Sequence, residues 1–446
     1  MSQSGMGQRH DDTIFALSSG AAPSGVAVIR LSGRGVRFGL ETLIGTVPAA
    51  RQAVLRTIRA PDGEILDRGL VLFFAAPASF TGEDVAELQV HGGRAVIAAV
   101  LKTLAALPGF RAAEAGEFTR RAFANGRADL TEIEGLADLV AAETEMQRRL
   151  AVRQAEGGLR RVYEDWRRRL IRARALVEAG LDFVDEEDVP DDVMAPAWAE
   201  AAGVAAEMAA HLDDQHWGER VRSGFEVVLL GEPNVGKSSL MNALVRREAA
   251  IVTAEPGTTR DLIEVSLDIG GHAVTLVDTA GLRETESVVE REGIARARRR
   301  ADAADLVLAL SDQDTVSETI PDGIQAIRVR TKLDLVDSDS KQTSGTDAIG
   351  ISVRTGEGLD ALVRAIGAAL DLARPMPSAL ITRTRQRDGV SQALVYLCEL
   401  AEAGSAAVEV KAELLRSAAD SLGRVTGKVD VEDLLDVIFS EFCIGK

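Results

Sequence analysis

The sequence predicts a multidomain protein of mixed α+β and α/β class. An N-terminal α+β domain precedes a discontinuous helical domain, into which a doubly wound α/β domain of the phosphate-loop type is inserted. Three observations predict this organisation. The chain has 446 residues, enough for about three domains. Strand-like and helix-like segments alternate from about 222 to 374, and amphipathic helical patterns lie on both sides of that region. The predicted ranges are 1–125, 126–222, 223–375 and 376–446, of which the second and fourth form the helical domain.

Composition limits the kinds of function that are expected. The formal net charge is −18 and the pI about 4.9. Non-specific nucleic-acid binding depends on Lys and Arg side chains that neutralise phosphates, so a nucleic-acid partner would be contacted through a confined surface. The first residues are polar, and no apolar run is long enough to cross a bilayer. We therefore expect a cytoplasmic protein without a membrane partner.

Cysteine chemistry is confined to two residues, Cys398 and Cys443. They are too few for a disulfide framework or a cysteine-rich metal cluster. A lone cysteine is usually a small buried apolar side chain, and we expect this of Cys398. Cys443 lies in FCIGK at 442–446, near a chain end, and is a candidate nucleophile.

The first 125 residues are predicted to form strands and one helix, and two isolated charged residues lie within the strands. Ranges 25–31, 69–75 and 85–90 are apolar or alternate at period two, and 94–107 has the pattern of an amphipathic helix. Arg30 and Glu87 interrupt two of these strands, and composition alone predicts a solvated face for each. His91, beside two glycines, is expected in a turn rather than as a ligand.

From about 126 the pattern becomes helical. Range 130–142 is one helix, and a later apolar stripe at three- and four-residue steps predicts a core-facing helix: Leu159, Val162, Trp166, Leu170, Ala173 and Val177. The opposite face is basic, with Arg148, Arg149, Arg153, Arg160, Arg161, Arg167, Arg168, Arg169, Arg172 and Arg174. A solvated helix face and a nucleic-acid surface both stay open as interpretations. Residues 378–446 are helical again, and we expect them to pack with 126–222.

The strongest motif is GEPNVGKS at 231–238. It has the G-x-x-x-x-G-K-[ST] spacing between an apolar strand at 225–230 and a helix at 239–245, which is the context of a phosphate-binding loop. The glycines let backbone N–H groups face the phosphates, and the helix N-terminus adds its positive dipole end. Lys237 is expected to reach the outer phosphates and Ser238 to bind Mg²⁺. The sequence therefore predicts a nucleotide-binding protein.

Four later segments occur in the order typical of a GTPase. PGTTRD at 256–261 lies where a switch segment would close on the γ-phosphate, and DTAG at 278–281 ends a strand. TKLD at 331–334 places Asp334 to accept two hydrogen bonds from a guanine edge, and SVR at 352–354 offers a backbone N–H to the guanine oxygen. Adenine lacks the donors that this carboxylate requires, so guanine is favoured.

The motifs do not by themselves identify the residue that would orient the attacking water. Many GTPases place a glutamine after Asp-x-x-Gly, but Leu282 stands there and cannot orient water. Phosphoryl transfer depends on positioning and charge neutralisation. Arg260 and Arg283 are candidate cations, and a bound monovalent cation is the alternative, for which the side-chain oxygen of Asn234 is suited.

At this point the chain resembles the MnmE (also TrmE) family of tRNA-modification GTPases over nearly its whole length. The segments that carry the resemblance are SFTGED at 79–84, HGG at 91–93, GEFTRRAF at 116–123, the phosphate loop at 231–239, AAIVT at 249–253 with PGTTRD at 256–261, DTAGLRE at 278–284 and FCIGK at 442–446.

The resemblance implies a homodimer with an N-terminal folate-binding and dimerisation domain. It implies a potassium-activated GTPase whose hydrolysis is driven when two GTPase domains dimerise around K⁺. With a flavoprotein of the MnmG (GidA) type that uses FAD and NADH, in a heterotetramer or larger complex, such proteins modify C5 of the wobble uridine in certain tRNAs. They add carboxymethylaminomethyl or aminomethyl groups with methylene-tetrahydrofolate as one-carbon donor; 5-formyl-tetrahydrofolate is the other folate form expected to bind.

The resemblance also implies roles for individual residues. It implies catalytic roles for Glu290, which would position the attacking water, for Cys443 in the modification chemistry and for Lys237. The implied K⁺ ligands are Asn234, Thr253, Glu255 and Thr258; the Mg²⁺ ligands are Ser238 and Thr259; and the folate contacts are Arg30, Glu87, Arg127 and Lys446, which overturns the solvated interpretation of Arg30 and Glu87. GTP contacts are expected from Asn234, Val235, Gly236, Lys237, Ser238, Ser239, Thr253, Ala254, Glu255, Pro256, Gly257, Thr258, Thr259, Asp278, Thr279, Ala280, Gly281, Thr331, Lys332, Leu333, Asp334, Ser352, Val353 and Arg354.

Three positions depart from the family pattern. Thr331 stands where these GTPases usually carry Asn, which removes an amide that supports the base and the phosphate loop, so weaker guanine affinity is expected. Arg127 replaces a Lys of some members with the charge kept, and Glu255 would bind K⁺ through its backbone carbonyl.

The alternative function is a ribosome-assembly GTPase acting as a GTP-dependent binding switch, which would need a basic RNA-binding module. A third possibility, the GTPase of an iron transporter, would need membrane segments.

Overall fold

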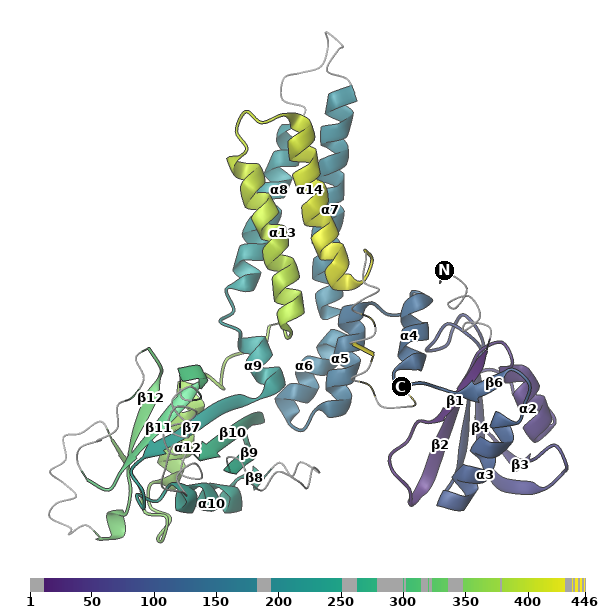
Figure 1. The fold of residues 1–446 in the computed structure, drawn as a ribbon, viewed down its shortest axis with the longest axis horizontal. Helices are drawn as coiled ribbons and strands as arrows, with labels where there is room; N and C mark the ends of the chain where they lie inside the picture. Colours follow the sequence, from purple (N-terminus) through teal and green to yellow (C-terminus); the bar gives the residue numbers. More distant parts are fainter. Residues whose placement is uncertain are drawn as a thin grey trace, which may run out of the picture. The chain divides into compact units, whose positions relative to one another are not determined.

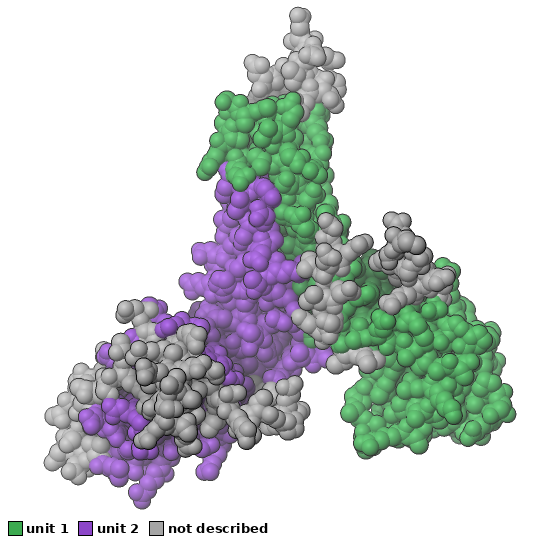
Figure 2. All heavy atoms as spheres, viewed as in Figure 1, with its two compact units in different colours: residues 1–137, 160–200, 399–446 green, residues 138–159, 201–398 purple. Residues whose placement is uncertain are grey.

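The structure is a computed structural model that describes residues 12–182, 194–250, 263–278, 300, 302–313, 320, 323–335, 348–377, 379–429, 435, 438–439, 442 and 445. The chain divides into two compact units (Figure 2). Residues 1–137, 160–200 and 399–446 belong to the first, and residues 138–159 and 201–398 to the second. Helices α5 (Leu130–Ala141), α7 (Gly158–Asp182), α8 (Ala195–Leu212) and α13 (Thr384–Glu402) contribute residues to both.

The first unit contains a six-stranded sheet in the order β3–β4–β5–β2–β1–β6. Neighbouring strands are antiparallel except β1 and β6, which are parallel. Helices α2 (Val36–Ile44) and α3 (Arg94–Ala105) pack on one face, where Ile29, Val71 and Leu88 lie in the core. The three predicted strands and the helix are confirmed as β2 (Ser24–Ser32), β4 (Ile65–Phe74), β5 (Val85–Gly92) and α3 (Figure 1). Strands β1 (Thr13–Leu17), β3 (Val54–Arg59) and β6 (Phe110–Ala112) were not predicted.

On the opposite face of this sheet, the described residues form a covering layer at the β1 end. Helix α4 (Glu117–Ala124) places Phe118 against Ile14 and Ala16 of β1. Toward β3 the same face is open: Leu55 and Leu70 stand opposite each other in the strand register and are 50% and 40% exposed. This face therefore presents apolar side chains at its β3 end.

Helix α7 carries the apolar stripe that the sequence predicted. Leu159, Trp166, Leu170, Ala173 and Val177 are buried, and the fully buried ring of Tyr163 takes the core position expected for Val162, which is half-buried. Within the first unit, α14 (Val408–Thr426) lies beside α7 (Figure 1). Just beyond its C-terminal end, the Lys428 ammonium lies 2.7 Å from the Glu164 carboxylate. The later helical residues thus pack with the earlier ones, as expected.

Carboxylates neutralise most of the predicted basic face. Six of its arginines form ion pairs with acidic side chains, most of them one turn away: Arg148 and Arg149 with Glu145, Arg160 with Glu132 and Glu164, Arg168 and Arg169 with Asp165, and Arg174 with Glu178. Pairs at this spacing are typical of solvated helices. Of the two interpretations, the structure favours the solvated helix face.

The second unit contains a seven-stranded sheet in the order β13–β12–β11–β7–β10–β9–β8. Helices α10 (Lys237–Arg247) and α12 (Leu359–Ala369) share one hydrophobic core with its strands. The five strands predicted from the sequence are present, and each pairs in parallel with the next one of this set in the sheet. They are β7 (Phe225–Gly231), β10 (His272–Asp278), β11 (Leu306–Ser311), β12 (Ala326–Arg330) and β13 (Ile349–Gly350).

The expectation of a parallel sheet is wrong at one edge. Strands β9 (Ile263–Ile269) and β8 (Ala249–Ala250) were not predicted, and β9 runs antiparallel to both β10 and β8. Gly270 and Gly271 have φ values of +62° and +86°, as the tight two-residue hairpin turns require. The signal was in the sequence, since two glycines between alternating apolar segments indicate a hairpin.

The prediction for Cys398 is also wrong. This residue of α13 is exposed rather than buried. Its neighbours Leu397 and Leu400 fill the inward positions of the helix, and the 3.6-residue period turns the residue between them outward.

Candidate functional site

The loop from β7 to α10 has the backbone of a phosphate cradle. Gly231, Asn234 and Gly236 have φ values of +153°, +63° and +108°. A Cβ atom on Gly231 would lie 2.6 Å from the carbonyl oxygen of Leu310, so glycine is required there. Such left-handed turns direct successive backbone N–H groups into one concavity, and the start of α10 adds its dipole. The loop therefore offers an anion site.

Lys237 lies in the mouth of this loop. Its side chain is 5% exposed, and its Nζ donates hydrogen bonds to the carbonyl oxygens of Gly231 at 2.5 Å and Glu232 at 2.9 Å. These bonds hold the ammonium beside the concavity. Phosphate oxygens are acceptors of the same kind with a full negative charge, so Lys237 is placed to bind them.

Ser238 and Asp278 meet next to the loop. The Ser238 Oγ donates to Asp278 Oδ2 at 2.7 Å, and Asp278 is fully buried at the end of β10. This pairing joins the N-terminus of α10 to the end of β10. It places a hydroxyl and a carboxylate side by side, a hard-oxygen pair of the type that Mg²⁺ prefers.

The predicted base-binding residues gather at the ends of β12 and β13. The Ser352 Oγ donates to Asp334 Oδ1 at 2.7 Å, and Ser352 is fully buried. The Lys332 Nζ lies 2.9 Å from Asp312 Oδ2, and the exposed Arg354 is 3.8 Å from Asp334 Oδ2. The sequence predicted a backbone N–H contact from the segment 352–354; the structure adds that the Ser352 hydroxyl orients the Asp334 carboxylate.

At Thr331 the structure differs from what the sequence led us to expect about support for the phosphate loop. The sequence predicted that a threonine here removes support from the phosphate loop. Thr331 is instead buried at 3% exposure, and its Oγ1 donates to the carbonyl oxygen of Val235, inside the loop, at 2.7 Å. The hydroxyl therefore links the base-binding segment to the phosphate loop, as an amide would.

Replacing Thr331 with Val should weaken the binding of a fluorescent GDP analogue by about tenfold, because the isosteric side chain leaves the Val235 carbonyl without its donor. Thr331→Ser keeps the hydroxyl and is the matched control, with affinity near wild type. Equal affinities for the Val and Ser variants would show that the link does not support the loop.

In the N-terminal sheet, Arg30 and Glu87 form a half-buried pair. They stand opposite each other in the β2–β5 register. The Arg30 Nη2 lies 3.0 Å from Glu87 Oε1, and the side chains are 23% and 19% exposed. The guanidinium carbon lies 5.8 Å from the ring centres of both Phe80 and Phe118. Two aromatic rings therefore lie beside the Arg30 guanidinium, and the pair is only partly exposed to solvent. The sequence did not indicate a role for either ring.

Arg127 reaches the same loop as Phe80. A Cβ atom on Gly82, two residues after Phe80, would lie 3.1 Å from Arg127 Cγ. Arg127 is itself exposed. The structure thus places three of the four predicted folate contacts around the segment that joins β4 to β5, and the fourth, Lys446, lies outside the described residues.

Twelve further predicted site residues also lie outside the described residues. They are Glu290 and Cys443, the switch residues Thr253, Ala254, Glu255, Pro256, Gly257, Thr258 and Thr259, and Thr279, Ala280 and Gly281.

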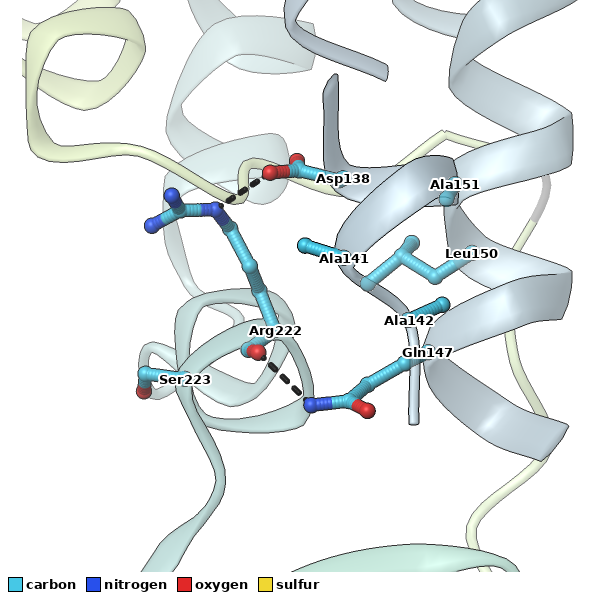
Figure 3. A pocket seen from close by; sticks show the side chains of 8 residues that line it. All are labelled: Asp138, Ala141, Ala142, Gln147, Leu150, Ala151, Arg222 and Ser223. Carbon is cyan, nitrogen blue, oxygen red and sulfur yellow. Dashed lines mark hydrogen bonds and ion pairs between the residues drawn. The ribbon is translucent and has the colours of Figure 1, made fainter. Parts of the chain in front are cut away.

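A separate cavity of about 310 Å³ lies in the second unit between α6 (Glu145–Ala155) and α9 (Trp217–Ser223). Arg222 Nε donates to Asp138 Oδ1 at 2.9 Å, and the Gln147 side-chain amide donates to the Arg222 carbonyl oxygen at 3.0 Å. Figure 3 shows both bonds. The other residues that line this cavity are mostly alanines and Leu150, and none of the predicted site residues lines it. These bonds hold α9, the helix that leads into β7 and the phosphate loop.

Comparisons with known proteins agree with this geometry. The family model of the MnmE helical domain matches residues 130–443, and that of the GTP-binding protein TrmE N-terminus matches residues 13–127. The tRNA modification GTPase MnmE of Mesorhizobium japonicum is 54% identical over 439 residues, covering 98% of this chain and 99% of that protein. The chain belongs to the MnmE family. A protein of the same description from Rhizobium meliloti is 54% identical over 440 residues, covering 98% of this chain and 99% of that one.

Membership of the MnmE family and the phosphate loop together identify a GTP hydrolase. Among solved structures, the G domain of the T. maritima FeoB iron transporter is 28% identical and covers 32% of this chain and 98% of that one, with a TM-score of 0.24, which is too low to bear on the fold. Within the described residues, every helix is too short or too polar to span a bilayer.

Proposed function

We propose that this chain is a K⁺-activated GTPase that modifies C5 of the wobble uridine of tRNA. It acts with an FAD-dependent flavoprotein of the MnmG (GidA) type, takes its one-carbon unit from a tetrahydrofolate, and hydrolyses GTP when two GTPase domains dimerise. The observation that carries this proposal is the coexistence of two sites in a chain of the MnmE family: a phosphate loop in the second unit, and in the first the half-buried Arg30–Glu87 pair with two aromatic rings beside Arg30.

The donor set at the phosphate loop fits Mg²⁺. Ser238 Oγ and the Asp278 carboxylate are adjacent hard oxygens, and the ion takes such ligands together with water and phosphate oxygens. Ser238 would bind the ion directly with Thr259, and Asp278 would hold its water shell. Mg²⁺ neutralises charge on the transferring phosphoryl group, while Lys237 contributes the protein's own positive charge.

Asn234 supports the proposal of K⁺ activation. Its side chain is exposed in the loop, and its amide makes no hydrogen bond to any described residue. The oxygen can therefore serve as a ligand, together with Thr253, Thr258 and the carbonyl of Glu255. Since Leu282 cannot orient water, Glu290 is the proposed acid that does so.

Exchanging K⁺ for Na⁺ at equal ionic strength should lower GTP turnover by about 10²-fold, a typical loss when one electrostatic contribution to a transition state is removed. Asn234→Ala should have low turnover in both salts. Asn234→Asp is the informative companion, because it keeps an oxygen donor and should retain part of the K⁺ effect. Equal wild-type rates in the two salts would contradict the cation site.

The Arg30–Glu87 pair has the chemistry of a folate pocket. A pteridine ring presents adjacent N–H donors, which the Glu87 carboxylate can accept, and a flat face that suits Phe80 or Phe118. Arg127 carries a positive charge for an anionic glutamate tail, and Lys446 is proposed to add another. Tetrahydrofolate supplies the one-carbon unit when it is bound; Arg30, Glu87 and the rings hold and orient it.

A homodimer is proposed to form through the N-terminal domain. The exposed Leu55 and Leu70 on the open sheet face give an apolar area for a second copy to cover. The flavoprotein and tRNA would complete the assembly.

The decisive experiment is mass analysis of wobble nucleosides in tRNA from cells with the wild-type gene, without it, and with Arg30→Ala. We expect modified C5 uridines only with the wild type.

A folate-binding measurement separates this proposal from the alternative of a ribosome-assembly switch. We expect the purified protein to bind 5-formyl-tetrahydrofolate and the Glu87→Ala variant to lose this binding. That alternative needs a basic RNA surface, and the arginines of α6 and α7 are largely paired with carboxylates. Unchanged nucleosides in cells lacking the gene would contradict the proposed function.

A further inference from the structure

Asp138, in the last turn of α5, accepts hydrogen bonds from two arginines that lie far apart in the chain. Its Oδ1 atom lies 2.9 Å from Arg222 Nε and 2.9 Å from Arg383 Nη2. The side chains of Asp138 and Arg383 are 14% and 12% exposed, and that of Arg222 is 34% exposed. One largely buried carboxylate oxygen therefore holds two cations.

The two arginines belong to the places where the chain enters and leaves the sheet of the second unit. Arg222 lies in the entry segment, which we define as residues 217–224 and which precedes β7. Arg383 ends the exit segment, residues 379–383, which precedes α13. A Cβ atom on Gly218 would overlap with a carbonyl oxygen of the exit segment, so the two segments are in backbone contact. Asp138 thus holds both segments at one junction.

Helix α6 holds the same two segments. The Gln147 side-chain amide donates to the Arg222 carbonyl oxygen at 3.0 Å (Figure 3). The side-chain amide of Gln154, which is 2% exposed, donates to the Leu380 carbonyl oxygen at 3.3 Å and to Thr382 Oγ1 at 2.8 Å. Protein interiors are usually close-packed, but the 310 Å³ cavity lies beside this junction. Hydrogen bonds rather than close packing therefore hold α9 to the end of α5.

The junction lies at the edge of the sheet opposite the phosphate loop. Strand β7 begins at Phe225 and ends at Gly231, and β10 runs parallel to it and ends at Asp278. Directly before β10, the Gly271 carbonyl oxygen accepts a 3.0 Å hydrogen bond from the Met146 N–H of α6. Each strand has seven residues and spans about 20 Å. Helices α5 and α6 therefore hold the starts of the two strands whose ends form the phosphate site.

We propose that Asp138 is a positioning residue that couples GTP turnover to tRNA modification, because it keeps the entry and exit segments in place against α5. Residues of α5 belong to both compact units. A movement that begins at the nucleotide and passes along β7 and β10 thus reaches α5 through this junction. Without the carboxylate the two guanidinium groups repel each other, and the entry segment moves independently of α5. The inference rests on the proposed function, since it assigns Asp138 to the step between hydrolysis and modification.

The test uses the full-length protein with tRNA and the flavoprotein, and measures GTP hydrolysis and tRNA modification in the same reactions. Asp138→Ala removes the carboxylate. Arg222→Met removes one of its partners and leaves the Gln147 bond to the backbone intact. Glu143→Ala is the matched control, because it removes an exposed carboxylate shortly after α5. The decisive readout is the number of GTP molecules hydrolysed per modified uridine, since a loss of folded protein lowers both rates in proportion and leaves this ratio unchanged.

We expect Asp138→Ala to lower the kcat of tRNA modification by about tenfold, with GTP turnover within about twofold of wild type and the KM for tRNA unchanged, the effect of losing a charged hydrogen bond. The ratio should therefore rise at least about fivefold, and Glu143→Ala should keep the wild-type ratio. Arg222→Met alone should raise the ratio in the same direction, which keeps the test possible if Asp138→Ala does not fold. Adding Arg222→Met to Asp138→Ala should change nothing further, since both break the same contact.

Two results would overturn the inference alone. One is a wild-type ratio in Asp138→Ala and Arg222→Met while the wild-type protein modifies tRNA. The other is additive effects of the two substitutions, which would show that Asp138 does not act through Arg222. If the wild type modifies no tRNA, the proposed function fails and the inference fails with it.

Discussion

Replacing Asp278 with Ala should lower the kcat of GTP hydrolysis by about 10²–10³-fold, the usual loss when a group that organises transition-state charge is removed. Asp278 is fully buried at the end of β10, and its carboxylate holds the Ser238 hydroxyl at 2.7 Å. The variant loses this orientation and the proposed hold on the Mg²⁺ water shell. Initial rates of phosphate release at saturating GTP, with K⁺ and Mg²⁺ present, measure the effect.

Two controls separate chemistry from folding. Asp360→Ala removes an exposed carboxylate at the start of α12 and should leave turnover unchanged. Asp278→Asn keeps the shape and one oxygen for Ser238, so it should retain more activity than Asp278→Ala. Turnover within about threefold of wild type in Asp278→Ala would contradict the assigned role.

Replacing Arg121 with Met should destabilise the N-terminal domain by about 3–5 kcal/mol, the cost of leaving buried charges unpaired. Arg121 is 2% exposed, and its nitrogens lie 3.1 Å from Glu83 Oε2 and 3.2 Å from Glu117 Oε1. The variant leaves two carboxylates without this cation. Because Glu83 lies on the loop that carries Phe80, and Glu117 precedes Phe118 on α4, the rings around Arg30 should also loosen.

Thermal unfolding and urea denaturation measure this effect. Arg68→Met on the exposed side of β4 is the matched control and should shift the midpoint little. Adding Glu117→Gln to Arg121→Met should recover part of the loss, as expected for a coupled pair. If the Arg121 and Arg68 variants unfold alike, the buried network does not stabilise the domain.

The same network predicts the direction of acid sensitivity. Burial opposes ionisation of Glu117, but hydrogen bonds from Arg111 and the Glu114 N–H, with the charges of Arg111 and Arg121, lower its pKa below the usual 4.5. A carboxylate with a lowered folded-state pKa stabilises the fold above its unfolded pKa and loses that contribution as the pH falls through the folded one. Stability should therefore decline below about pH 4.5, and less steeply in Glu117→Gln.

Much of the fold followed from local patterns. The apolar runs that became β7, β10, β11 and β12 are bounded by turn residues and short enough to be recognised as strands. The phosphate loop could be predicted because its glycines, lysine and serine are contiguous. Strand β9 was missed, although its alternation and the following Gly270 and Gly271 indicated a hairpin. Tyr163 replaced Val162 in the core because a predicted stripe has an uncertainty of one position on a helix face.

The sequence by itself determined the features that depend on neighbouring residues: a GTP-binding loop, within which Ser238 is proposed to bind Mg²⁺, and the segment 331–334, in which Asp334 is proposed to bind guanine. Only the tertiary structure decided what depends on residues far apart in the chain. It paired Arg30 with Glu87 beside two aromatic rings, joined Thr331 to the phosphate loop through Val235, neutralised most of the arginine face, and brought Gly445 against Ser18. The physical reason is that hydrogen bonds and ion pairs between distant segments are set by strand register and helix packing, which no local spacing encodes.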